Sequence, residues 1–423
     1  MNIKFSPELK SELVAQMERE KLLTRSNNQF WYPLSRPTYG IDEVLQALDS
    51  MAAFRTTMWD KTRQFEQAFS GYIGVKSAMV NSGSSADLLL AFSLLKESGG
   101  PLSRGDEVLV PSVTWPTQLW SVAMAGFEPV LVDVDPKTLN MNLDDLVKKI
   151  TKKTRAIFVV HLMGNPIDLD KVLDIAEYHG LLVLEDCCEA LGARWGENHV
   201  GSQSYGSSFS FFFSHHITTM EGGMVGCKNS ELADRIRLLR AHGWSRGLQT
   251  NQGPYSTLLS DTSLDSRYTF LEWGFNVRPT ELQAGFGIEQ LRKLPNYIEV
   301  RNHNFLMIKE IVKKLKIKAH LPEVGDLGMP SWFAVPMMLS EPLAGKRQQI
   351  TQKLQNLGIE TRPIVAGNLT KQPVKRRFKW LQNENLVGAS KIHEQGFYFG
   401  LHPNDINVDI DRIEDCLRKA FQD

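Results

Sequence analysis

Short apolar segments alternate with amphipathic segments through the middle of the chain. Val108-Leu109-Val110 and Leu181-Leu182-Val183-Leu184 are apolar on successive residues, which is typical of strands covered on both faces. Stretches with apolar residues at helical spacing lie between such segments, and this alternation predicts an α/β fold with a mainly parallel sheet. The expected strands are Ser77–Val80, Glu107–Pro111, Glu128–Val134, Ala156–His161, Leu181–Glu185 and Gly223–Cys227, and the expected helices are Ala86–Lys96, Gln118–Ala125, Leu143–Ile150, Leu169–Tyr178 and Ser230–Ala241.

The two ends of the chain carry different patterns. Apolar positions predict a helix over Pro7–Leu23 and a long connecting helix from Pro279 past Arg301. Beyond it we expect a smaller α/β unit, with strands at Phe333–Met338, Glu360–Pro363 and Gly396–Phe399 and a helix at Arg347–Leu357. The sequence therefore predicts an N-terminal helical extension (residues 1–30), a large domain (31–290) and a small C-terminal domain (291–423).

A long polar stretch interrupts this pattern. Residues Gly247 to Asp265 are rich in Gly, Ser, Thr, Gln and Asn, which predicts a loop. Long loops in compact domains are often functional, so our hypothesis is that this loop shapes a substrate pocket.

Composition and charge narrow the class of protein. The 423 residues carry 48 basic and 48 acidic side chains and no net charge, so the sequence predicts no binding to nucleic acid or to an anionic membrane. No apolar run approaches the roughly 20 residues that span a bilayer, and the N-terminus lacks an apolar signal core. Four cysteines do not make a disulfide framework in a chain of this length, so we expect a reduced, cytoplasmic protein.

Five segments at expected strand ends or loops carry candidate chemistry, because α/β folds place ligands there. In the first, Gly83, Ser84 and Ser85 precede a helix, where backbone N–H groups and hydroxyls suit a phosphate. A plain turn and helix cap explains this segment equally well. In the second, Trp115 follows a strand and offers a flat face to a cofactor ring, although core packing is the plainer interpretation.

The other three segments add a carboxylate, a histidine pair and an amide. Asp186 ends an apolar strand, where its carboxylate can pair with a protonated pyridine nitrogen or cap a helix. Ser210 lies shortly before His215 and is a second candidate phosphate contact, while His215 and His216 together also fit a structural pair. Asn276 belongs to the fifth segment, which reads as a loop leading into a helix.

In this order and spacing, the five segments resemble the DegT/DnrJ/EryC1/StrS family of sugar aminotransferases, which are pyridoxal-phosphate (PLP) enzymes of fold type I. The resemblance covers roughly residues 30–423. It implies that Asn276 reaches the phosphate in the neighbouring subunit, so a homodimer with shared active sites is expected. It also implies cofactor contacts within the chain: to the phosphate from Gly83, Ser84, Ser85 and Ser210, to the ring face from Trp115, and to the pyridine nitrogen from Asp186. Glu189 is a further expected cofactor-binding residue.

The chain departs from the family at one position. His215 stands where the family has the lysine that holds PLP covalently as an imine, a bond that imidazole cannot form. A small branch of the family shares the histidine: the nucleotide-sugar 3-dehydratases, which act on GDP-4-keto-6-deoxymannose or CDP-4-keto-6-deoxyglucose. The segments around Asn165, Cys187 and Arg362 resemble this branch as well. The resemblance thus implies C3 dehydration of an NDP-4-keto-6-deoxyhexose, with Asp186 and His215 as the catalytic residues and His215 as acid and base.

The same resemblance implies the cofactor and the partners. Non-covalently held pyridoxamine phosphate (PMP) is the expected resting cofactor, L-glutamate the amino donor that restores it, and deoxysugar synthesis for lipopolysaccharide O-antigen the expected role. CDP-type members carry a [2Fe–2S] cluster, which needs four close thiolates or equivalent ligands. No cysteine lies between Cys227 and Cys416, so we predict no iron–sulfur cluster and no metal. The nucleotide, GDP or CDP, stays open.

Two other functions stay open at this point. A sugar aminotransferase that tolerates the missing lysine fits the scaffold but not His215. A non-catalytic homologue that binds PLP or a nucleotide sugar fits the lost lysine, but the retained cofactor contacts argue against decay. Three arginines, Arg240, Arg246 and Arg278, are candidates for a diphosphate or a glutamate carboxylate, and each is equally well explained as a structural residue.

Overall fold

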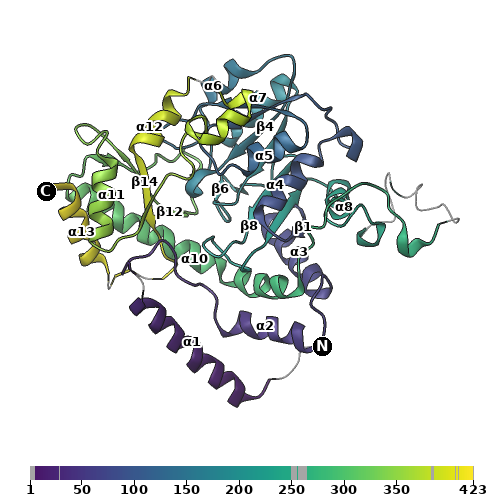
Figure 1. Cartoon of the computed structure of the whole chain (residues 1–423), viewed down its shortest axis with the longest axis horizontal. Coiled ribbons are helices and arrows are strands. Elements are labelled where there is room, and N and C mark those ends of the chain that lie inside the picture. Colours follow the sequence, from purple (N-terminus) through teal and green to yellow (C-terminus); the bar gives the residue numbers. More distant parts are fainter. Residues whose placement is uncertain are drawn as a thin grey trace.

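A seven-stranded mixed sheet forms the centre of the molecule (Figure 1). The structure, a computed structural model, describes residues 5–27, 29–248, 255, 264–382, 385–404, 406–407 and 409–422. The sheet has the order β1-β9-β8-β5-β4-β2-β3; β9 is antiparallel to β1 and β8, and the other neighbours are parallel. Its strands are β1 (Lys76–Val80), β2 (Glu107–Pro111), β3 (Glu128–Val132), β4 (Thr154–Val160), β5 (Leu182–Asp186), β8 (Gly206–Ser210) and β9 (Gly223–Cys227).

Apolar cores cover both faces of this sheet, as the runs of successive apolar residues predict. Along β2, Val108 and Val110 belong to one core and Leu109 to another, because successive side chains of a strand point to opposite faces. All three side chains are fully buried. The first core includes residues of α4 (Gly83–Phe92), α5 (Thr117–Met124) and α8 (Ser230–Leu239), and the second includes residues of α6 (Leu143–Lys149) and α7 (Leu169–His179).

The sequence predicts every strand of the large sheet except β8. Its residues are small or polar apart from Phe209, yet all of them are buried. Two buried hydroxyls are satisfied by hydrogen bonds, since Ser207 Oγ donates to the carbonyl oxygen of Gly201 (2.7 Å) and Ser208 Oγ donates to the carboxylate of Asp87 (2.6 Å). A central strand can therefore lack the apolar run that identifies the others.

A second, four-stranded antiparallel sheet lies toward the C-terminus, in the order β10-β12-β14-β13. It shares an apolar core with two of the helices of this part, α11 and α13. The elements predicted for this part of the chain are present. Their bounds are β10 (Ala319–His320), β12 (Ala334–Leu339), β13 (Thr361–Pro363), β14 (Gly396–Gly400), α11 (Arg347–Asn356), α12 (Val387–Gln395) and α13 (Ile410–Gln422), and a short sheet is formed by β6 (Arg194–Trp195), β7 (Asn198–His199) and β11 (Gly328–Met329).

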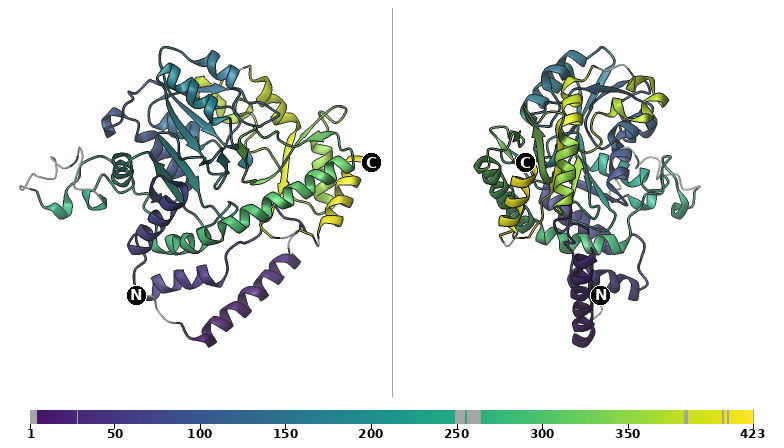
Figure 2. Two further views of the ribbon diagram at one scale, coloured as in Figure 1. Left: turned by 180° about the vertical axis from the view of Figure 1, so that it is seen from behind. Right: turned by 60° about the vertical axis from the view of Figure 1, so that its left-hand side comes forward.

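The long helix α10 (Glu281–Lys314) runs from the large sheet to the small one (Figure 2). Near its start, Leu291 and Leu294 pack in a core beside the large sheet. Near its end, Phe305 and Ile308 pack in the core of the small sheet. The predicted connecting helix is therefore confirmed, while the predicted domain boundary at residue 290 stays a prediction.

Three helices precede the large sheet: α1 (Pro7–Asn27), α2 (Ile41–Ala52) and α3 (Asp60–Ile73). The predicted α1 stands away from the body (Figures 1 and 2). The sequence does not predict α2 and α3, which pack on α10. Among the described residues, no helix has both the length and the apolar character that crossing a membrane requires. Residues 249–254 and 256–263 of the predicted polar loop lie outside the described residues.

Candidate active site

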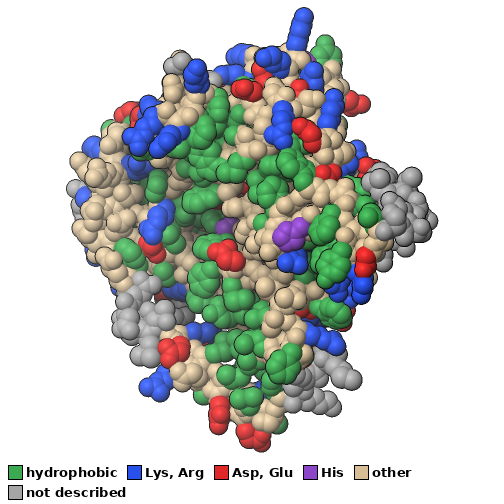
Figure 3. Space-filling model, turned by 45° about the vertical axis from the view of Figure 1, so that its right-hand side comes forward, with side chains coloured by type: hydrophobic (Ala, Val, Ile, Leu, Met, Phe, Trp, Pro, Cys, Tyr) green, Lys and Arg blue, Asp and Glu red, His purple; other side chains and the backbone are tan. Residues whose placement is uncertain are grey.

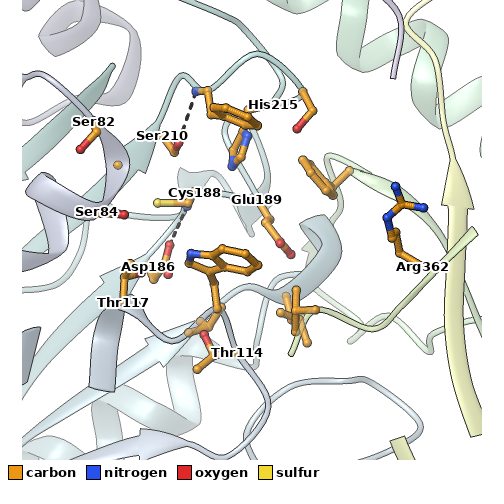
Figure 4. Close-up of a pocket in the computed structure, with 18 of the residues that line it drawn as sticks. Ser82, Ser84, Thr114, Thr117, Asp186, Cys188, Glu189, Ser210, His215 and Arg362 are labelled. Atoms are coloured by element: carbon orange, nitrogen blue, oxygen red, sulfur yellow. Dashed lines mark hydrogen bonds between the residues drawn. The ribbon is translucent and has the colours of Figure 1, made fainter. Parts of the chain in front are cut away.

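A cavity of about 480 Å³ opens at the carboxyl ends of the parallel strands (Figure 4). In α/β proteins this edge of the sheet is where ligands bind. The small sheet lines the cavity with Arg362 of β13 and Tyr398 of β14. Residues at or just after the ends of five strands, β1, β2, β4, β5 and β8, line it as well: Ser82, Thr114, Val160, Asp186 and Ser210.

One end of the cavity has the groups of an anion site. The helix α4 begins there, and the Ser82 side chain caps it by accepting a hydrogen bond from the N–H of Ser85 (3.2 Å). Ser82, Ser84 and Ser210 lie on the same side of the cavity in Figure 4. Gly83 packs so closely that a Cβ added to it would lie 2.4 Å from the Cβ of Ser210. Hydroxyls around a helix N-terminus suit a phosphate group.

Three buried carboxyl groups lie in or beside the cavity and lack a basic partner among the described residues: Asp186 and Glu189, which line it, and Asp87, which lies behind Asp186. Burial raises the pKa of Asp186 to about 7, against a hydrogen bond that its Oδ1 accepts from the Cys188 N–H (2.8 Å). Burial likewise raises the pKa of Glu189 to about 7, and burial together with the charge of Asp186 raises that of Asp87. A cationic ring nitrogen bound here would relieve this crowding of acidic groups.

Trp115 lies at the mouth of the cavity and is 60% exposed. Core packing, the plainer interpretation of this residue, is therefore wrong. The preceding residue is fixed in the interior, because the Thr114 hydroxyl donates a hydrogen bond to the side-chain oxygen of Gln118 (2.6 Å). The indole thus presents a flat apolar face to whatever fills the cavity.

The two neighbouring histidines have different surroundings. His216 is buried and binds the carbonyl oxygen of Ser331 through Nε2 (2.8 Å), as a structural histidine does. His215 lines the cavity, and its ring meets Phe333 edge-on at 5.2 Å between ring centroids and Phe212 at 6.0 Å.

The imidazole of His215 is available for proton transfer. Its Nδ1 is buried and has no hydrogen-bond partner in the part of the chain that the structure describes. Burial, and secondarily the positive charge of Arg301, lowers the pKa of His215 to about 4. The ring is therefore neutral near pH 7 and can accept a proton.

Two of the expected cofactor contacts do not line this cavity. The hydroxyl of Ser85 donates to Oδ1 of Asn81 (2.7 Å) inside the start of α4. Asn276 is exposed, and its Oδ1 accepts a hydrogen bond from Nε of Arg278 (3.0 Å). Arg240 has a structural role, because its buried guanidinium binds the carboxylate of Glu66 (2.6 Å).

The cavity also contains residues that sequence reasoning did not assign to it. Glu221 follows His215 in the same loop, so its place in the sequence could have predicted that it lines the cavity. Arg362, Phe333 and Tyr398 come from the small sheet, far along the chain, and no local pattern places them beside His215. The segment around Arg362 resembles the 3-dehydratase branch, but the sequence predicts no role for this arginine.

These groups fit PLP or PMP held without a covalent bond. Gly83, Ser84 and Ser210 suit the phosphate, and the exposed face of Trp115 suits the ring. The carboxyl of Asp186, which has no basic partner among the described residues, suits the pyridine nitrogen. No lysine occurs among the described residues that line the cavity. The predicted cofactor contacts within the chain are thus brought together, apart from Ser85.

A mainly parallel sheet with a cavity at its carboxyl edge, closed by a small C-terminal sheet, is the architecture of the fold type I class of PLP-dependent enzymes. Within that class, the chain belongs to the DegT/DnrJ/EryC1/StrS aminotransferase family, whose model matches residues 39–418. The predicted fold class and the resemblance to this family are therefore confirmed.

The relatives of this chain include enzymes of the histidine branch. GDP-4-keto-6-deoxy-D-mannose 3-dehydratase of Yersinia pseudotuberculosis is 36% identical over 393 residues, which are 92% of this chain and 98% of the relative. The E. coli GDP-4-keto-6-deoxy-D-mannose-3-dehydratase with bound hydrated PLP superposes with a TM-score of 0.86 at 31% identity, covering 92% of this chain and 100% of the other. A GDP-4-keto-6-deoxymannose-3-dehydratase with a trapped PLP-glutamate geminal diamine superposes with a TM-score of 0.85 at 31% identity, covering 91% of this chain and 100% of the other.

Proposed function

We propose that this protein removes the C3 hydroxyl of a GDP-linked 4-keto-6-deoxyhexose, with PMP as cofactor and L-glutamate as the donor that restores it. The observation that carries the proposal is His215, which lies in the cavity at the lysine position of the family, among groups that suit the cofactor. The 3-dehydratase relatives favour this activity over amino-sugar formation, and the GDP-sugars in their names favour GDP over CDP.

The residues at the two walls of the cavity bind and orient the cofactor. Ser84, Ser210 and the N-terminus of α4 hold the phosphate, and Trp115 covers one face of the ring. Asp186 pairs with the pyridine nitrogen and keeps it protonated, and Glu189 also lines the cavity. When bound, the cofactor supplies an electron sink for the electron pair that a departing proton leaves behind.

His215 moves the protons. The neutral imidazole accepts a proton at a ring nitrogen from the C4′ carbon of the cofactor. It then donates this proton to the C3 hydroxyl oxygen of the sugar, which leaves as water. Phe212 and Phe333 hold the ring in place for both steps, and positioned acid–base catalysis of this kind contributes about 10²–10⁴-fold.

The proposal includes a cytoplasmic homodimer that supplies deoxysugars for lipopolysaccharide. Asn276 is exposed outside the cavity of its own chain, which suits a contact to the cofactor of a neighbouring subunit. Large hydrophobic side chains are also exposed, including Phe54 at 93% and Trp59 at 45%. Figure 3 shows hydrophobic side chains gathered in a band along one face. Exposed apolar surface of this kind is typical of protein contacts.

The test is to incubate the protein with PLP, L-glutamate and GDP-4-keto-6-deoxymannose, and in parallel with CDP-4-keto-6-deoxyglucose as the alternative substrate. We expect ammonia and a 3-deoxy ketosugar, identified by mass spectrometry, from the GDP-sugar. Steady formation of an amino sugar without ammonia would identify an aminotransferase instead, and binding without turnover would identify a non-catalytic homologue. Iron analysis of the purified protein completes the test, because a stoichiometric iron–sulfur cluster contradicts the proposed cofactor chemistry.

A further inference from the structure

Arg301 is a buried arginine that has no anionic partner in the part of the chain that the structure describes. It lies in α10 and is 4% exposed. Neither Nε nor Nη1 has a hydrogen-bond partner, and no carboxylate pairs with the guanidinium, among the residues that the structure describes. Burial lowers the pKa of Arg301 to about 10, which still leaves it fully charged near pH 7. A buried charge without a partner carries a large desolvation penalty, so such an arginine requires an explanation.

Arg301 lines a second cavity, of about 300 Å³, on the far side of His215. This cavity adjoins the cofactor cavity, because six residues line both. The residues common to the two cavities are Phe212, Ser214, His215, Phe333, Arg362 and Tyr398. Figure 4 shows Arg362 on the side of the cofactor cavity opposite Ser82 and Ser84, toward which the second cavity extends.

The charges around the second cavity leave one positive charge uncompensated. Arg362 pairs with Glu360 (2.7 Å) and Arg36 with Asp409 (3.4 Å). His215 and His216 carry no charge near pH 7, because burial lowers the pKa of both rings. Arg301 is therefore the charged side chain that has no opposite charge among the described lining residues. A ligand with one negative charge would therefore compensate the charge of the cavity lining.

We infer that the second cavity is the subsite for a carboxylate of the amino donor, with Arg301 as the cation that binds it. The inference rests on the proposed function, in which a dicarboxylic amino acid delivers its amino group beside His215. A molecule of that size fits a cavity of about 300 Å³, with its amino end toward the cofactor cavity and one carboxylate at Arg301. The planar guanidinium offers a fork that matches a carboxylate, and a phosphate group has related chemistry.

The first test measures the thermal stability of the PLP-loaded protein without amino donor. Arg301→Met should leave the melting temperature equal to or above that of the parent, because the substitution removes a buried charge that has no partner. The matched control is Arg292→Met on the same helix, where the exposed guanidinium pairs with Glu289. A lower melting temperature for Arg301→Met than for the control, or failure to fold, would show that Arg301 is a structural residue and would overturn the inference.

The second test uses glutarate, a dicarboxylate that has no amino group and cannot react. Titration of the PLP-loaded protein by calorimetry should show one site per chain that Arg301→Met weakens by about 10–150-fold, as expected for a hydrogen bond to a charged group. Arg301→Lys keeps the positive charge but lacks the planar guanidinium, so its affinity for glutarate should lie between those of the parent and Arg301→Met. Inorganic phosphate and GDP are the competing probes. Binding of either at Arg301 in place of glutarate, or glutarate binding that ignores the substitution, would overturn the inference.

The two half-reactions separate this inference from the proposed function. Conversion of PLP to PMP by L-glutamate is followed by absorbance, and dehydration is started separately from protein loaded with PMP. Arg301→Met should raise the KM for glutamate by a larger factor than it changes dehydration by the PMP form, which Arg301 affects only as the secondary cause of the lowered pKa of His215. Glutarate binding through Arg301 without any dehydration would refute the proposed function alone. Normal dehydration with an unchanged KM for glutamate would refute the subsite alone.

Discussion

Gly83 is the residue at which the phosphate end of the site tolerates least change. An added Cβ would lie 2.4 Å from the Cβ of Ser210, 2.7 Å from its Oγ and 3.1 Å from its Cα. Carbon atoms in contact normally lie about 3.5–4.0 Å apart. Gly83→Ala must therefore move the start of α4 or the end of β8 by roughly an ångström. Both segments carry hydroxyls that we assign to the cofactor phosphate.

The expected size of the effect follows from this overlap. Overpacking of a well-packed interior costs about 1–3 kcal/mol. If the cost appears in cofactor binding, the dissociation constant for PLP rises by about 5–150-fold, at about 1.4 kcal/mol for each factor of ten. If the segments instead resist movement, the same cost appears as a lower free energy of unfolding. Both quantities must therefore be measured.

Urea denaturation of the cofactor-free protein gives the free energy of unfolding, and titration with PLP followed by absorbance gives the dissociation constant. The matched control is Gly71→Ala in α3, where a Cβ meets nothing within 4 Å. This helical control should be neutral or stabilising by up to about 1 kcal/mol. Ser210→Gly removes the two nearest atoms, so the double variant Gly83→Ala/Ser210→Gly should recover part of the loss, with a coupling energy of about 0.5–3 kcal/mol.

Two results would refute this reasoning. One is a Gly83→Ala protein that matches the Gly71→Ala control in both stability and PLP affinity. The other is a double variant whose free energy of unfolding is the sum of the two single changes, because the overlap with Ser210 would then not be the cause.

Three further predictions concern the carboxylate and the histidine. His215→Lys should attach PLP covalently, as detected by mass after borohydride reduction, and should slow dehydration by about 10²–10⁴-fold; a variant that dehydrates as fast as the parent contradicts the assigned role. Because the pKa of His215 falls from 6.5 to about 4 on folding, the unfolded chain binds more protons between these pH values, and stability rises with pH through this window. His215→Asn should flatten this part of a plot of urea midpoint against pH, and an identical slope would count against a lowered pKa of His215 in the folded protein. Asp186→Asn should weaken PLP binding by about 10–150-fold, measured by absorbance titration, and an unchanged dissociation constant would exclude the pairing with the pyridine nitrogen.

The part of the site that was predictable lies at the ends of strands. Asp186 follows an apolar run, and the run itself shows that the residue ends a strand covered on both faces. Gly83 and Ser84 precede a helix for a similar local reason. Parallel strands end at a common edge, so these local assignments already predict that the side chains meet. The domain boundaries and the roles of the individual site residues stay predictions.

Features without a local pattern could not be predicted. The start of α3 shows this clearly, because Glu281 of α10 accepts hydrogen bonds from the N–H groups of Trp59 (2.6 Å), Lys61 (2.7 Å) and Thr62 (3.0 Å). A helix capped by a residue so distant in sequence has no capping signal of its own. The strand β8 has no apolar run that would predict it. Its buried hydroxyls are tolerated in the interior because Ser207 and Ser208 donate hydrogen bonds to Gly201 and Asp87.

The sequence by itself determined the α/β fold, the family and the replacement of the lysine by His215, because apolar periodicity and motif order are local properties of a chain. Only the tertiary structure decided that Trp115 is exposed at the cavity mouth and that His216 is buried against Ser331 while His215 lines the cavity. It also decided that Arg301 has no anionic partner among the described residues. These properties depend on burial and charge pairing between segments far apart in the chain. They exist only once the segments have packed together.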